Sequence, residues 1–357
     1  MLFSPFRMRG LTLANRIVVS PMCQYSAVNG IAGDWHIVHL GGLGLSGAGL
    51  LMLEATAVSV EGRITPGCLG LWSDEHAAAL SRVLSIVRRY SPIAIGIQLS
   101  HAGRKASSRS PADGGGPLPR EEGAWQAIGP DVIPFADRPP PKMMDRSDMD
   151  RIVTAFVKAA ISADRVGFDL IELHGAHGYL IGSFLSPLAN QRHDRYGGSL
   201  ANRMRFPLEI FEAVRAVWPA EKPLGMRING SDWAARGITI EEAAEFAIAL
   251  RERGCDFVDL SSGGNQRANI PATPGYQVPF AAHVRKMAGI PTIAVGLIRD
   301  PHHAEQALVN GQADLIAIAR GFLAEPRWPW RAARELGGAV HIPPQWARAA
   351  SRAIQRA

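Results

Sequence analysis

Two histidines three residues apart, His174 and His177, are the residues of this chain best suited to do chemistry. Each is followed by a glycine, Gly175 or Gly178, and the segment ends at Tyr179. In an extended strand, residues three apart point to opposite faces, so the two rings can converge only if the chain turns. Glycine permits such a turn because it has no Cβ. We therefore expect both imidazoles to face one site.

The pair admits three interpretations. Two neutral imidazoles could donate N–H bonds to one substrate oxygen, could ligate a metal with Glu172, or could be buried histidines satisfied by backbone. The metal interpretation lacks ligands, because no Asp/Glu cluster completes an open site around them. The flanking glycines and the following Tyr179 favour substrate binding. A metal-dependent hydrolase or lyase that uses His174 and His177 remains the alternative.

Two further residues stand out against apolar surroundings. Arg227 lies in the middle of an apolar run, where a buried guanidinium needs an anion or several acceptors. The candidates for a structural ion pair on neighbouring predicted strands are Glu54 and Glu172. Cys23 follows Pro-Met at the end of another run. It is either a small buried hydrophobe or a nucleophile that uses one of the two histidines as base.

These residues need elements that position them, and short apolar runs recur at regular intervals along the chain. Most runs are continuous rather than alternating, which is typical of parallel strands buried on both faces. The eight runs are Ile17–Ser20, Leu50–Glu54, Ile93–Leu99, Asp169–Leu173, Leu224–Ile228, Phe257–Leu260, Thr292–Val295 and Leu315–Ala319. Segments with helical periodicity lie between them: Ser73–Arg89, Met149–Arg165, Leu200–Val217, Ile240–Arg253 and Pro301–Asn310.

Eight strands alternating with helices predict an α/β fold, a closed (β/α)8 TIM barrel formed by residues 1–357 as a single domain. A doubly wound sheet would need a GxGxxG between a strand and a helix, and the sequence has none. Residues 104–147 should be an excursion after the third strand, Tyr179–Gly198 a long loop after the fourth, and residues 338–357 a C-terminal tail. In such a barrel the carboxyl ends of all strands face one mouth.

The last two strand ends suit a phosphate. Gly296 follows the seventh strand, and Ala319 and Arg320 follow the eighth. Barrels often hold phosphate there on backbone N–H groups, and Arg320 adds a fixed charge.

Composition excludes several classes of protein. Hydrophobic residues make up 47% and charged residues 20%, which rules out a disordered chain, and no run of about 18 apolar residues could span a membrane. The net charge of +6 is dispersed apart from the arginine-rich end, so we expect no nucleic-acid partner. The three cysteines are odd in number and far apart, without a CxxC pair, which indicates a reducing cytoplasm and no disulfide framework.

Taken together, the motifs resemble those of the old yellow enzymes, flavin-dependent ene-reductases, and more narrowly their thermophilic-like subclass, to which a xenobiotic reductase belongs. The motifs that carry the resemblance are Asn15 through Tyr25, Glu54 through Ala57, Gly62 through Thr65, Gly70 through Asp74, Gln98 through Lys105, His174 through Leu180, Tyr196 through Ser199 with Asn202-Arg203, and the ends at Gly296 and Arg320.

The resemblance implies non-covalent FMN at the mouth of the barrel. Cys23 would tune its redox behaviour, and Arg227 would sit by the N1 and O2 atoms, where negative charge develops on reduction. Ala319 stands where the family often has glycine, but its backbone N–H remains. The residues implied to bind FMN are Ser20, Pro21, Met22, Cys23, Ala57, Gln98, Arg227, Gly296, Ala319 and Arg320.

The resemblance also implies the reaction. NADPH or NADH would reduce the flavin, and an activated alkene, an α,β-unsaturated carbonyl or nitro compound, would then accept hydride from flavin N5 at Cβ. His174 and His177 would bind the carbonyl oxygen, Tyr179 would protonate Cα, and Tyr25 would be a second substrate contact. In this subclass an arginine near the carboxyl end reaches a neighbouring subunit's site. Arg348, with Trp346, occupies that place, which implies a homodimer or a tetramer of dimers.

Overall fold

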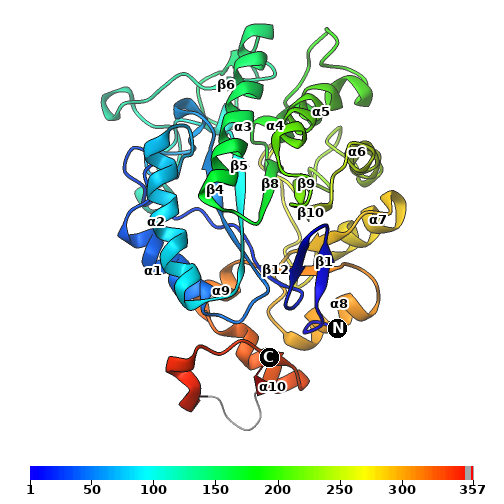
Figure 1. Ribbon diagram of the computed structural model, residues 1–357. Coiled ribbons are helices and arrows are strands. Elements are labelled where there is room, and N and C mark those ends of the chain that lie inside the picture. The colour runs from blue at the N-terminus through cyan, green and yellow to red at the C-terminus, as the bar shows by residue number, and fades with distance from the viewer. Residues whose placement is uncertain (350–354, 357) are drawn as a thin grey trace.

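The computed structural model describes residues 1–349 and 355–356, and its core is a closed barrel of eight parallel strands (Figure 1). The strands are β3 Ile17–Val19, β4 Leu50–Ala57, β5 Ala94–Ser100, β8 Leu170–Gly175, β9 Leu224–Asn229, β10 Phe257–Ser261, β11 Thr292–Ala294 and β12 Leu315–Ile318. The barrel closes where β12 pairs with β3, with Ile316 opposite Ile17. The predicted (β/α)8 barrel is confirmed, and each of the eight apolar runs supplies one strand.

Helices surround the barrel (Figure 1). They are α1 Asp34–Gly44, α2 Asp74–Tyr90, α3 Arg146–Val166, α5 Leu200–Val217, α6 Ile240–Glu252, α7 Val278–Ala288 and α8 Pro301–Val309. The prediction missed α1, whose three glycines weaken the helical signal, and α7, which begins with a Val-Pro pair. It also began α3 three residues late, because the N-cap is Asp145 in a capping box with Asp148.

An amino-terminal hairpin closes the end of the barrel opposite the mouth. Its strands are β1 Phe6–Met8 and β2 Leu11–Leu13. Met8 and Leu13 are buried against side chains near the amino ends of the barrel strands. That apolar layer contains Val18, Leu50, Met52, Leu170, Phe257, Ile293, Leu315 and Ala317. The lower half of the barrel is therefore a sealed core, which leaves the carboxyl ends for a site.

The excursion after β5 is mostly loop, with two short strands, β6 Ile128–Gly129 and β7 Lys142–Met143, and it rises at the top of Figure 1. The predicted long loop after β8 was wrong in part, because it contains a buried helix, α4 Leu180–Leu185. Six residues are too few to show a periodicity in the sequence. After β12 the chain forms α9 Arg320–Ala324, α10 Trp328–Leu336 and β13 Ala339–Val340, which pairs with β14 Gln355–Arg356.

The tail reaches beyond the part of the chain that the structure describes, since residues 350–354 and 357 lie outside it. Within the described residues, no helix combines the length and the apolar character that crossing a bilayer requires.

Candidate active site at the mouth of the barrel

The two histidine rings converge at the end of β8. Nε2 of His174 lies 3.3 Å from Nδ1 of His177, and the rings are almost perpendicular. The turn is made by His177 and Gly178, which have φ angles of 58° and 69°, whereas Gly175 remains in the strand. Gly178 packs directly on the backbone of Gly264, which leaves no room for a side chain. The expected convergence is therefore present, and the chain turns at the second of the two glycines rather than at the first.

Both imidazoles are held neutral. Burial lowers the pKa of His174 and of His177 well below the usual value, and the nearby charges of Arg227 and Lys105 lower it further. A neutral imidazole has one N–H to donate. Nε2 of His177 lies 2.7 Å from Oγ of Ser261 at the end of β10, which fixes the orientation of its ring.

Tyr179 faces the histidines rather than the core. Its ring centre lies 4.9 Å from that of His174, edge to face. The ammonium group of Lys105 lies over the Tyr179 ring, 5.0 Å from its centre. Burial raises the pKa of the Tyr179 phenol well above its usual value. The phenol therefore keeps its proton at neutral pH, as a proton donor must.

Cys23 and Tyr25 form the opposite side of the mouth, at the end of β3. Their side chains hydrogen-bond to each other, and burial raises the pKa of the Cys23 thiol well above its usual value. The backbone of this segment is held by Glu54, whose carboxylate accepts a bond of 3.0 Å from the N–H of Gln24. A thiol kept protonated in this way does not suit the nucleophile interpretation of Cys23.

Polar side chains fill the barrel below the mouth. Nε2 of Gln98 donates to Oε1 of Glu172 over 2.6 Å. The other carboxyl oxygen of Glu172 has no hydrogen-bond partner among the described residues. Burial, with the charge of Asp259, raises the pKa of Glu172 to about 8. Glu172 therefore binds Gln98 instead of serving as a ligand beside the two histidines.

The prediction of an ion pair between Arg227 and Glu54 or Glu172 was wrong. Nε of Arg227 instead lies 3.2 Å from a carboxylate oxygen of Asp259, which is directly opposite in the β9–β10 register. Asp259 lies within the otherwise apolar run Phe257–Leu260, where the run itself gives no sign of an ion pair. Nε of Arg227 is buried and makes no hydrogen bond with good geometry in the described structure. The guanidinium thus retains donor capacity toward a ligand.

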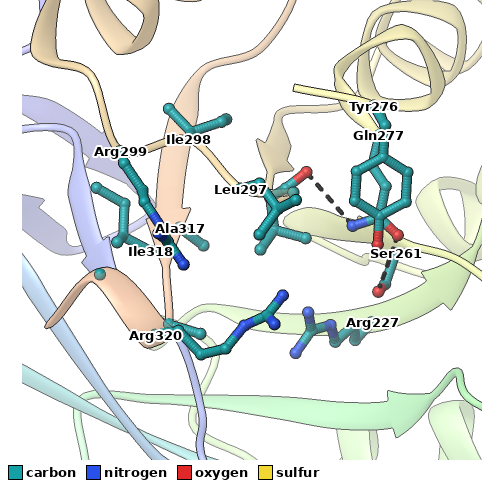
Figure 2. Close-up of a pocket in the computed structure, with 14 residues that line it drawn as sticks. Arg227, Ser261, Tyr276, Gln277, Leu297, Ile298, Arg299, Ala317, Ile318 and Arg320 are labelled. Carbon is teal, nitrogen blue, oxygen red and sulfur yellow. Dashed lines mark hydrogen bonds between the residues drawn. The ribbon is translucent and has the colours of Figure 1, made fainter. Parts of the chain in front are cut away.

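A cavity of about 160 Å³ opens at the ends of β11 and β12 (Figure 2). It is lined by the predicted Gly296, Ala319 and Arg320, and the guanidinium groups of Arg227, Arg299 and Arg320 turn toward it. The prediction did not include Arg299, which lies in a loop with no sequence pattern of its own. The volume is more than ten times what one water molecule needs, so the cavity has room for an anionic group.

The remaining predicted residues follow β3 or end β4, two strands that lie between β12 and β8 in the barrel. Ser20 is buried, its N–H bonds to the carbonyl of Ile318 over 3.0 Å, and its hydroxyl has no partner within the described structure. Ala57 is buried at the end of β4, and Pro21 and Met22 are half-buried. The whole set fits a ligand with a flat polar ring at one end and a phosphate at the other.

The tail residues stand apart from this set. Trp346 packs edge to face on Trp330, with Arg327 over its ring at 4.2 Å, and Arg348 is exposed. In the described part of the tail, these contacts do not bring Trp346 or Arg348 to the histidines of their own chain.

Comparison with known proteins finds relatives whose names all describe nicotinamide-dependent oxidoreductases. The model of the NADH:flavin oxidoreductase / NADH oxidase family matches residues 1–337. A protein named NADPH dehydrogenase from Geobacillus sp. is 46% identical over 351 residues, which cover 98% of each chain. The NADPH dehydrogenase of Geobacillus thermodenitrificans is 45% identical and covers 97% of this chain and 98% of its own.

Solved structures share the architecture. Morphinone reductase in complex with tetrahydroNAD superposes with a TM-score of 0.78 at 27% identity, over 96% of this chain and 93% of that one. A 2-naphthoyl-CoA reductase superposes with a TM-score of 0.84 at 24% identity, a likeness of fold alone. The comparison covers 94% of this chain, but only 52% of the longer reductase.

Proposed function

Since the chain belongs to the NADH:flavin oxidoreductase / NADH oxidase family, we propose that it reduces the C=C bond of α,β-unsaturated carbonyl compounds, and of activated nitro compounds. The chain is an FMN-dependent NAD(P)H oxidoreductase of the old yellow enzyme family, as the sequence predicted. The metal-dependent hydrolase or lyase alternative is set aside, because the family's chemistry is flavin chemistry. Small activated alkenes are the proposed substrates.

The residues of the mouth fit FMN. In this proposal Gln98, Arg227 and Ala57 meet the polar edge of the ring, and the unsatisfied donors on Arg227 and Ser20 are explained by that ligand. The phosphate occupies the cavity at Gly296, Ala319 and Arg320, with Arg299 as an additional cation. Pro21, Met22 and Cys23 line one face, where Cys23 tunes the redox behaviour. When bound, FMN accepts electrons from the nicotinamide and supplies hydride to the substrate.

One observation carries the proposal: two neutral imidazoles converge within 3.3 Å at the mouth of the barrel. Donors preorganised around one point stabilise negative charge that develops on an oxygen there. In our proposal His174 and His177 hold the substrate carbonyl, which makes its β-carbon electrophilic. Tyr25, across the mouth, is a further substrate contact.

Tyr179 holds the proton that the reaction needs at the α-carbon. Its phenol is neutral and faces His174, as a general acid above the bound carbonyl would. The reduction is then complete, with hydride at the β-carbon and a proton at the α-carbon.

The proposal extends to the domain organisation, the subunit assembly and the location of the protein. We propose that the whole chain acts as one FMN-binding domain and that Arg348, with Trp346, completes the site of a neighbouring subunit in a homodimer or a tetramer of dimers. A cytoplasmic location is supported by the three cysteines, all of which are free.

The test is an anaerobic stopped-flow titration of the purified holoprotein. NADPH or NADH should bleach the flavin absorbance, and enones, maleimides or nitroalkenes should restore it with formation of the saturated product. A colourless protein that contains stoichiometric zinc would contradict the proposal and favour the metal alternative. A flavin that nicotinamides reduce and no activated alkene reoxidises would refute the substrate class alone.

A further inference from the structure

Ser261, the last residue of β10, is buried, and its hydroxyl lies between two side chains. Its Oγ is 2.7 Å from Nε2 of His177 and 3.4 Å from Oε1 of Gln277. Within the described residues, the hydroxyl has no other hydrogen-bond partner. A serine hydroxyl has a single proton to donate, so these two contacts compete for it.

The geometry gives that proton to His177. An O–H···O bond is normally about 2.5–3.0 Å long, so the contact of Ser261 with Gln277 is too long to be a good one. Oε1 of Gln277 also accepts a much closer bond, of 2.6 Å, from the hydroxyl of Ser262. Figure 2 shows the Gln277 amide beside Ser261 at the edge of the cavity. The acceptor left at a short distance is therefore Nε2 of His177.

A donor at Nε2 decides the state of the whole His177 ring. The ring is neutral, because burial and the charge of Arg227 lower its pKa well below the usual value. A neutral imidazole carries a proton on one nitrogen only, and the hydrogen bond at one nitrogen sets which one that is. Since Nε2 accepts from Ser261, the N–H group is at Nδ1. Nδ1 is the nitrogen that faces His174, at 3.3 Å.

The same reasoning applies to the ring of His174, which is also neutral. The backbone N–H of Ala176 donates to its Nδ1 over 3.3 Å, so the proton of His174 is on Nε2. The two nitrogens that face each other across 3.3 Å are therefore both N–H donors. Two donors cannot bond to each other, and the pair is satisfied when one oxygen accepts from both.

We propose that Ser261 is a positioning residue, which sets the tautomer of His177 so that Nδ1–H points at the substrate oxygen. The inference rests on the proposed function. With the proton on Nε2 instead, Nδ1 would direct a lone pair at that oxygen and repel it. Ser261 does not touch the reacting atoms and acts through the ring. A backbone amide sets the tautomer of His174, whereas a side chain sets that of His177, so only the second is open to substitution.

The test compares Ser261→Ala, which removes the donor, with Ser261→Thr, which keeps a hydroxyl and suits a strand. In holoenzyme labelled with 15N at histidine, the NMR shift of each ring nitrogen distinguishes its protonated from its unprotonated form. The signals of His177 are assigned by their loss in His177→Ala. We expect the Nδ1–H form in the wild type and in Ser261→Thr, and the appearance of the Nε2–H form in Ser261→Ala. Flavin absorbance reports folding in each variant.

Phenol affinity gives a second measurement. Ser261→Ala should raise the Kd of a phenol about 3- to 10-fold, the worth of one neutral hydrogen bond, and Ser261→Thr should restore it. Ser183→Ala is the matched control, because Ser183 is also buried and its hydroxyl donates to the carbonyl of Leu180 over 2.7 Å. It should change neither the His177 signals nor the Kd.

Three outcomes would overturn the assignment. They are a wild-type His177 ring protonated at Nε2, His177 signals that do not change in Ser261→Ala, and a folded Ser261→Thr variant that binds phenol no better than Ser261→Ala. The NMR measurement needs no substrate, so it separates this inference from the reaction. A protonated Nδ1 in an enzyme whose flavin no enone reoxidises would refute the proposed function and leave the tautomer assignment intact.

Discussion

Gln98 on β5 and Glu172 on β8 face each other across neighbouring strands, and the amide nitrogen of Gln98 donates to Oε1 of Glu172 over 2.6 Å. The bond fixes which end of the Gln98 amide points toward the mouth. It also lies in a buried layer with Arg227 and Asp259, whose opposite charges act on Glu172. The protonation of Glu172 therefore responds to both of these charges as well as to its burial.

Replacement of Glu172 should change the pH dependence of stability. Because burial raises the pKa of Glu172 to about 8 from its ordinary value of 4.5, the folded state holds a proton that the unfolded state has lost. The free energy of unfolding should thus fall as pH rises from 4.5 to about 8. Glu172→Gln should flatten this decline in urea titrations across that range. Glu252→Gln, at an exposed position on α6, is the control, and an unchanged slope in Glu172→Gln would contradict the prediction.

The double variant His174→Ala/His177→Ala should retain FMN but bind phenols, which mimic the enolate, far more weakly. Loss of two hydrogen bonds to an anionic oxygen should weaken binding about 100-fold or more. The charge-transfer absorbance of the phenol complex measures this affinity. Unchanged phenol affinity would remove both histidines from substrate binding.

Tyr179→Phe should slow reoxidation by an enone about 10²- to 10⁴-fold, the usual contribution of a general acid. Reduction of the flavin by NADPH should change little, because that half-reaction needs no proton at carbon. Stopped-flow measurement of each half-reaction separates the two effects. Equal slowing of both halves would instead indicate that Tyr179 only shapes the pocket.

Arg227→Met should weaken FMN binding and make the flavin harder to reduce. The guanidinium lies in the barrel next to Asp259, and the variant would leave that carboxylate buried without its cation. Flavin dissociation followed by fluorescence, and the midpoint potential in a dye titration, measure the two effects. Asp259→Asn combined with Arg227→Met removes the stranded charge and should restore stability without restoring the potential. An unaltered potential in both variants would place Arg227 away from the flavin.

Arg348→Ala should raise the KM for enones while FMN stays bound, if Arg348 serves a neighbouring subunit. Co-expression offers a sharp check: mixed dimers of Arg348→Ala and His174→Ala subunits should regain one intact site. The Arg348→Ala subunit then has both histidines and receives the arginine of its partner. A mixture no more active than the two separate variants would argue against a shared site, as would a monomer in light scattering.

The sequence predicted the barrel because buried parallel strands appear as continuous apolar runs, and each of the eight runs forms a strand. It also predicted that His174, His177 and Tyr179 lie together, because the glycines beside the two histidines indicate a turn. It could not reveal the Arg227–Asp259 pair, which depends on the register between two strands, or Arg299, whose direction depends on a loop. The amino-terminal hairpin was also missed, since each of its short strands has a polar residue in the middle, Arg7 or Thr12, and forms no continuous apolar run.

That hairpin has a consequence for how the molecule assembles. Met8 and Leu13, near the start of the chain, pack against Leu315 and Ala317 of the last barrel strand. During synthesis some three hundred residues must follow these apolar side chains before β12 is made and their burial is complete. Contacts so distant in sequence form slowly. The hairpin is thus among the last elements of the barrel to complete its burial, and its apolar side chains are available to chaperones until β12 has formed.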